Sequence, residues 1–163
     1  MTRVFVLDDH DVVRRGLKEL LEDSGDIEVV GEASTAGEAR SRIPSAEPDV
    51  AVLDVRLSDG NGVAVCREIR SRHPEIKCVM FSAFDDEVAI VESILAGASG
   101  YVLKQIRGGD IVNAVRVVAS GESLFEPALR VRVLDDAEKT STARSATRAA
   151  VPPAVTRPGR GRD

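Results

Sequence analysis

The sequence lacks several features that define whole classes of protein. It has only two cysteines, Cys66 and Cys78, and they do not form a Cys-x-x-Cys pair, so we expect buried, reduced thiols rather than a disulfide framework. No apolar run approaches the ~18 residues of a membrane span. No basic segment or cleavage site of a signal peptide precedes the first apolar run. These absences predict a cytoplasmic protein with no membrane contact.

Acidic residues outnumber basic ones over most of the chain. The net charge of the 163 residues is −5, but residues 139–163 carry six Lys and Arg against one Asp, a net charge of +5. Residues 1–138 therefore carry −10. Because an acidic body repels the phosphate backbone of DNA, we do not expect the folded part to bind DNA by itself.

Short apolar runs alternate with segments of helical periodicity. Runs this short, mostly followed by a polar residue, are typical of strands that are buried on both faces. The runs lie at residues 4–7, 27–33, 50–53, 78–81 and 100–103. Five strands alternating with five helices predict an α/β fold: a doubly wound, five-stranded parallel sheet with helices on both faces.

Polar and glycine residues mark several helix ends. Asn61 is expected to cap a helix that stops before Pro74. Asp85 is expected to cap the next helix, which ends at Gly97, and the last helix of the domain is expected to end at Gly121.

The pattern weakens after this last helix. We expect one folded domain over residues 1–121, followed by a linker-like segment at 122–135 that forms at most a short helix. Residues 136–163 consist largely of Ser, Thr, Ala, Arg and Pro, with few apolar residues to anchor a core. This composition predicts a disordered basic tail.

Polar side chains follow four of the predicted strands at the point where each one ends. Ligands of an open parallel sheet bind in the crevice at this edge. We therefore expect three carboxylates, one hydroxyl and one ammonium to converge there, from Asp8, Asp9, Asp54, Ser82 and Lys104.

This set of groups suits a metal ion and a phosphoryl group. Clustered carboxylates repel one another and need a cation, and oxygen ligands suit Mg²⁺. A carboxylate is also a nucleophile that can form an acyl phosphate. The metal would then neutralise the incoming phosphoryl group, and Lys104 would pair with its oxygens.

The same residues lie in motifs that resemble the receiver domain of two-component response regulators. The motifs are VLDDH at 6–10, LDVRLSDGNG at 53–62, SA at 82–83 and GYVLK at 100–104. The match covers roughly residues 1–121, and AGASGY at 96–101 is similar to the NarL/FixJ (LuxR-type) subfamily. The resemblance implies a flavodoxin-like, CheY-like (βα)5 fold and a signalling domain that assists only its own phosphorylation and dephosphorylation, not an enzyme with a separate substrate.

The resemblance also implies a phosphoacceptor and a set of metal ligands. Asp54 would accept a phosphoryl group from the phosphohistidine of a sensor histidine kinase. Asp9 would ligate Mg²⁺ directly and Asp8 through water. Asp54 and the backbone carbonyl of Arg56 would be further ligands.

Two further roles follow from the resemblance, and they concern the switch. Ser82 and Lys104 would each bond an oxygen of the phosphoryl group. Tyr101, the only tyrosine of the chain, would turn inward as Ser82 moves toward the phosphate. His10, beside the two aspartates, is expected to be a helix-start residue, because no hydroxyl or thiol partner is suggested for it.

Three functions remain open at this point. The first is a receiver that switches partner binding or dimerisation on phosphorylation. The second is a truncated transcriptional regulator that pairs with itself or with full-length relatives; LuxR-type regulators continue into a helix-turn-helix domain, and only about 40 residues follow Gly121 here. We therefore expect no sequence-specific DNA binding by this chain alone. The third is a phosphatase of the haloacid-dehalogenase type, which places its nucleophile after the first strand as Asp-x-Asp.

Overall fold

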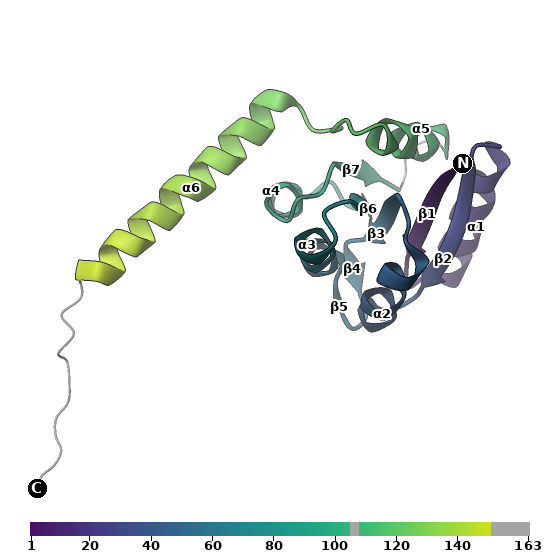
Figure 1. The fold of residues 1–163 in the computed structure, drawn as a ribbon, viewed down its shortest axis with the longest axis horizontal. Coiled ribbons are helices and arrows are strands. Elements are labelled where there is room, and N and C mark those ends of the chain that lie inside the picture. Colours follow the sequence, from purple (N-terminus) through teal and green to yellow (C-terminus); the bar gives the residue numbers. More distant parts are fainter. Residues whose placement is uncertain (105–107, 151–163) are drawn as a thin grey trace, which may run out of the picture.

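Five parallel strands form the central sheet, as the apolar runs predict. The computed structural model describes the backbone of residues 1–104 and 108–150. It describes the side chains of residues 1–104 and 110–139. The strands are β1 (Thr2–Leu7), β2 (Ile27–Ala33), β3 (Val50–Asp54), β6 (Lys77–Ser82) and β7 (Gly100–Leu103). They lie in the order β2-β1-β3-β6-β7 (Figure 1). This is the doubly wound strand order of flavodoxin and CheY, so the predicted fold class is confirmed.

Helices cover both faces of the sheet, because successive strand residues point to opposite sides. In β1, Val4 and Val6 pack in one buried cluster, and Phe5 and Leu7 pack in the other. The first cluster is covered by α1 (Asp11–Asp23) and α5 (Gly108–Ala119). The second is covered by α2 (Ala36–Ala46), α3 (Gly62–Arg72) and α4 (Glu87–Leu95) (Figure 1).

Most of the predicted helix ends are present. The Asn61 side chain accepts a hydrogen bond from the amide of Val63 at 2.6 Å, and α3 ends before Pro74. Gly97 and Gly121 follow α4 and α5 with positive φ angles of 92° and 97°, the conformation that favours glycine after a helix.

The predicted cap of α4 is wrong by one residue. Asp86, not Asp85, has the extended backbone of a cap, and its carboxylate accepts hydrogen bonds from the amides of Val88 and Ala89 at 3.0 and 3.3 Å. Two adjacent aspartates are equivalent as caps in the sequence. The backbone angle at which the preceding loop enters the helix decides between them.

A small hairpin that the sequence does not predict follows β3. It pairs β4 (Arg56–Leu57) with β5 (Gly60–Asn61). In its turn, Asp59 accepts hydrogen bonds from the amides of Ala36 and Gly37 at 2.8 and 3.1 Å. The loop after the third strand is therefore tied to the beginning of α2.

The last helix, α6 (Pro127–Ala150), is longer than the sequence predicts. The sequence predicts at most a short helix before residue 136, but α6 continues through Ala150; residues 151–163 of the expected tail lie outside the described residues. Leu129 and Val133 pack against the cluster under α4 and anchor its first turns, and Ala, Arg, Glu and Lys favour continuation of the helix. Its second half extends away from the sheet (Figure 1).

Both cysteines are buried thiols, as expected. A hydrogen bond with Cys66 and burial raise the pKa of Cys78, which makes this thiol unreactive at neutral pH. Among the described residues, no helix is long and apolar enough to cross a bilayer.

Candidate functional site

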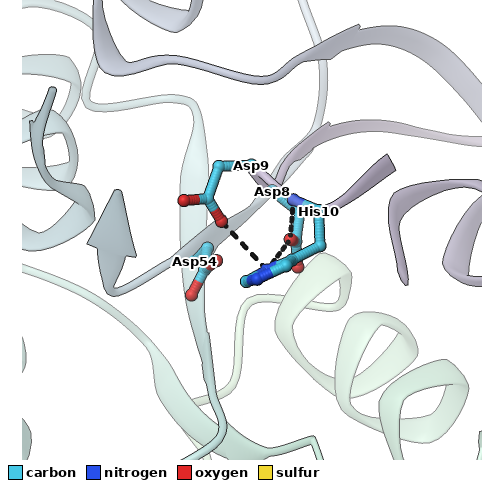
Figure 2. A group of neighbouring side chains, drawn as sticks. All are labelled: Asp8, Asp9, His10 and Asp54. Atoms are coloured by element: carbon cyan, nitrogen blue, oxygen red, sulfur yellow. Dashed lines mark hydrogen bonds and ion pairs between the residues drawn. The ribbon is translucent and has the colours of Figure 1, made fainter. Parts of the chain in front are cut away.

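The carboxyl ends of β1 and β3 lie side by side where the strand order reverses, and this brings the three predicted carboxylates together. Asp8, Asp9, His10 and Asp54 each offer one ligand atom, and these atoms all lie within 4.8 Å of one another (Figure 2). Asp8 is fully buried and Asp54 is only 5 % exposed. A doubly wound sheet binds its ligand at this reversal point.

Lys104 reaches the same place from the end of β7. Its Nζ lies 2.8 Å from Asp8 Oδ2 and 3.1 Å from Asp54 Oδ2. The backbone amide of Lys104 donates a 2.7 Å hydrogen bond to the carbonyl of Ser82 and continues the pairing of β6 with β7. One ammonium therefore pairs with two of the three carboxylates, and negative charge remains in excess.

The excess negative charge fits a divalent cation. Within the described part of the chain, Asp8 Oδ2 and Asp9 Oδ1 are buried, and no backbone amide donates to either of them. Their near neighbours are the Lys104 ammonium, 2.8 Å from Asp8 Oδ2, and the His10 imidazole, whose Nδ1 atom lies 3.1 Å from Asp9 Oδ1 (Figure 2). Carboxylate oxygens are the ligands that hard cations prefer, so these residues are suited to hold a metal ion.

The environment of Asp54 opposes its charged form. Burial, together with the negative charges of Asp8 and Asp9, raises the pKa of Asp54 to about 6 even though Lys104 acts in the other direction. Burial lowers the pKa of Lys104, but its hydrogen bonds and ion pairs with Asp8 and Asp54 outweigh burial and leave that pKa raised. Asp54 is thus a carboxylate that gains from any cation placed beside it.

A glycine that sequence reasoning missed fixes the position of Asp54. A Cβ atom at Gly62 would lie 1.9 Å from the backbone carbonyl oxygen of Asp54. The Gly62 amide also donates a 2.8 Å hydrogen bond to the carbonyl of Val55. Only a residue without a side chain lets α3 begin this close to the end of β3, and a glycine directly after a capping Asn is the signal that points to it.

Two residues of the first helix also support the site, and sequence reasoning did not assign this role to them. His10 is the N-cap residue of α1, as expected, and its imidazole faces both aspartates. The guanidinium of Arg14 donates a 2.8 Å hydrogen bond to the backbone carbonyl of Asp8 and pairs with Asp11 and Glu32. An arginine one turn into a helix that follows an acidic pair is a usable signal for such a contact.

Ser82 and Tyr101, the two predicted switch residues, are linked through Phe84. The Ser82 Oγ accepts a 3.1 Å hydrogen bond from the amide of Phe84, and the Tyr101 hydroxyl donates a 2.7 Å bond to the carbonyl of the same residue. Phe84 is 52 % exposed, and the guanidinium carbon of Arg56 lies over its ring, 4.3 Å from the ring centroid. Arg56 follows Asp54 by two residues in β4, and metal ligation by its backbone carbonyl stays a prediction.

The order of these residues along the sheet matches a known family. Residues 4–116 match the family model of the response regulator receiver domain. The chain belongs to this family. Receiver domains are signalling domains of two-component systems, so the haloacid-dehalogenase alternative is rejected.

Individual relatives agree with this receiver assignment. The chain is 48 % identical over 143 residues to the DNA-binding transcriptional activator DevR/DosR of Mycobacterium tuberculosis, covering 85 % of this chain and 66 % of that protein. A LuxR-family response regulator of Aurantimonas sp. SI85-9A1 has 29 % identity and a TM-score of 0.73, covering 83 % of this chain and 98 % of its own. A CheY-like receiver protein of Methanospirillum hungatei JF-1 has 26 % identity and a TM-score of 0.70, covering 74 % and 95 %. The chain thus spans just under two thirds of the length of the curated relative.

Proposed function

We propose that this receiver accepts a phosphoryl group on Asp54 from the phosphohistidine of a sensor histidine kinase. A carboxylate oxygen of Asp54 attacks phosphorus, the P–N bond of the phosphohistidine breaks, and the imidazole nitrogen keeps the electron pair. The observation that supports this most strongly is the position of Asp54, which ends β3 between the Lys104 ammonium and the acidic pair Asp8 and Asp9.

Magnesium is the cation that these ligands suit best. Asp8, Asp9 and Asp54 offer carboxylate oxygens, and we propose the backbone carbonyl of Arg56 as a further ligand. When bound, the ion supplies positive charge that offsets the phosphoryl oxygens. Asp8, fully buried, is also held by the amide of His10 at 2.9 Å, so it orients the site whether or not it touches the ion directly.

Lys104 acts mainly on the phosphorylated form of Asp54. Its ammonium pairs with the Asp54 oxygen before transfer, and after transfer it pairs with an oxygen of the phosphoryl group. Because Asp8 still holds Nζ at 2.8 Å, the ammonium changes partners with little movement.

Ser82 and Tyr101 carry the signal away from the site. When the Ser82 hydroxyl turns to a phosphoryl oxygen, the amide of Phe84 loses its acceptor, and the loop between β6 and α4 is loosened. The Tyr101 hydroxyl donates a hydrogen bond to the carbonyl of Phe84. When the loop is loosened this bond is lost, and the Tyr101 ring turns inward. Phosphorylation thereby changes the surface formed by α4, β7 and α5.

This surface is the proposed output face. Val88, Val91 and Leu95 form an exposed apolar row along α4, 66 %, 37 % and 43 % exposed, at helical spacing. We propose that phosphorylation lets the face pair with a second copy or with a full-length regulator of the same type. Regulation then proceeds by protein contact, without sequence-specific DNA binding by this chain alone.

The test of this function is phosphorylation by a small donor. Acetyl phosphate with Mg²⁺ is expected to add one phosphoryl group to the wild type, measured by intact mass. Asp54→Asn removes the nucleophile and is expected to prevent the adduct, whereas Asp23→Asn, at the exposed end of α1, leaves it unchanged. Equal labelling of Asp54→Asn and wild type would refute the proposal.

A further inference from the structure

A polar cavity of about 260 Å³ lies at the edge of the sheet opposite to Asp54. It is built where β6 and β7 begin, and it is closed by the connection from α5 to α6 and by α6 itself. Its polar lining comes from α3, the two strand beginnings, the α5–α6 connection and α6: Arg70, Lys77, Ser99, Glu122, Ser123 and Arg130. We propose that this cavity binds a small anion that carries a phosphate group, and that the bound anion fastens α6 to the domain.

The charge of the cavity is the first support. Three cationic side chains line it against one carboxylate, Glu122, while the net charge of residues 1–138 is −10. None of the ion pairs found among the described residues involves Arg70, Lys77 or Arg130. Positive charge thus exceeds negative charge at one place in an acidic body, and this excess attracts anions.

The cavity is also held in shape before any ligand enters. The Arg70 guanidinium donates hydrogen bonds to the carbonyls of Gly97 and Ile76 at 3.1 and 2.9 Å. These neutral acceptors fix the group without removing its charge. The carbonyl of Ser99 accepts a 2.7 Å hydrogen bond from the amide of Leu124, and this bond holds the α5–α6 connection against β7. A preformed site spends less free energy on ordering its side chains when it binds.

The arrangement favours a phosphate group over a planar carboxylate. Cations approach from three separate elements, with Arg70 on α3, Lys77 on β6 and Arg130 on α6. A tetrahedral dianion has oxygens for each of them, and charge-assisted hydrogen bonds to phosphate are among the strongest in proteins. The hydroxyl of Ser99 adds a further donor at the wall, while the Ser123 hydroxyl donates to the carbonyl of Ser99 at 3.4 Å and helps to hold the wall in place.

The consequence concerns the junction between α6 and the domain. Arg130 projects from α6 toward a cavity that already contains two cations of the body, so without an anion these charges repel one another. An anion between them turns repulsion into attraction and strengthens the contact that Leu129 and Val133 make under α4. The position of α6 then depends on the concentration of the anion, independently of phosphorylation at Asp54.

The test is an amide-shift titration by NMR of the full chain, without divalent cations. The probes are inorganic phosphate, pyrophosphate and glycerol phosphate, with sodium chloride at matched ionic strength as reference. We expect saturable shifts at residues 97–99 and 121–123 but not at 54 or 82, and slower amide exchange over residues 127–139. Comparing the three probes separates free phosphate from a phosphate ester as the source.

Charge-removing variants locate the site. Lys77→Gln and Arg130→Gln each remove one charge-assisted contact. Each is expected to weaken binding of the probe with the highest affinity about tenfold. Arg15→Gln, an exposed cation of α1, serves as control and is expected to bind like the wild type. Saturation by none of the probes at millimolar concentration, shifts reproduced by chloride, or equal affinity in all three variants would each overturn the proposal.

Discussion

Replacing Asp54 by Asn is expected to stabilise the metal-free protein, although it removes the phosphoacceptor. The pKa of Asp54 is raised from 3.8 to about 6, so its charged form is disfavoured in the fold. The difference is roughly 2 pH units, and each unit corresponds to about 1.36 kcal/mol. Because Asn is uncharged and nearly isosteric, Asp54→Asn is expected to raise the free energy of unfolding by about 3 kcal/mol at pH 8.

The sign of the pH dependence follows from the raised pKa. Between pH 4 and pH 6 the unfolded state gives up the Asp54 proton before the folded state does, so the contribution of Asp54 to the stability of the wild type falls as the pH rises. The advantage of Asp54→Asn is therefore near zero below about pH 4, grows up to about pH 6 and stays constant above it. Urea unfolding with a chelator present, at several pH values from 4 to 8, measures this course.

Asp23→Asn is the control for the general effect of removing a carboxylate. It lies at the exposed end of α1, so its change in stability is expected to stay within about 0.5 kcal/mol. If Asp54→Asn is less stable than the wild type at pH 8, or if its advantage does not depend on pH, the proposed electrostatic strain at Asp54 is refuted.

The remaining predictions concern the metal, the lysine and the glycine. Mg²⁺ is expected to stabilise the wild type by about 1–3 kcal/mol at roughly ten to a hundred times its Kd; thermal melts are expected to show this gain largely lost in Asp9→Asn, and no shift in the wild type would contradict the metal site. Lys104→Ala is expected to accept the phosphoryl group but to lose the change in amide exchange that phosphorylation causes over residues 82–104. An undiminished change in the variant would contradict the role of Lys104 in the phosphorylated state. Gly62→Ala forces a Cβ against the Asp54 carbonyl and is expected to cost about 3 kcal/mol or more in urea unfolding, with slower phosphorylation by acetyl phosphate; a variant as stable and as reactive as the wild type would show that the close approach is not required.

The sheet and the convergence of the acidic residues could be predicted from the sequence because each depends on a local pattern. A strand such as β1 is apolar on both sides, with Val4 and Val6 in one cluster and Phe5 and Leu7 in the other. Such a strand must lie inside a sheet covered by helices on both faces. The carboxyl ends of parallel strands then share one edge, so the sequence alone places Asp8 near Asp54.

What could not be predicted depends on contacts between distant segments. The requirement for glycine at position 62 arises only when α3 packs against the end of β3. The choice of Asp86 over Asp85 as a cap depends on the angle of the incoming loop. The length of α6 depends on Leu129 and Val133 reaching the cluster under α4, because an isolated segment of this composition is marginal as a helix.

The central claim is that Asp54 carries the phosphoryl group, and chemical trapping of the acyl phosphate tests it most directly. After reaction with acetyl phosphate and Mg²⁺, borohydride reduces an aspartyl phosphate to homoserine, and peptide mass spectrometry locates the change. We expect one modified residue per chain, at position 54, and none when Mg²⁺ is chelated. Modification at Asp8, Asp9 or elsewhere with position 54 intact would contradict it.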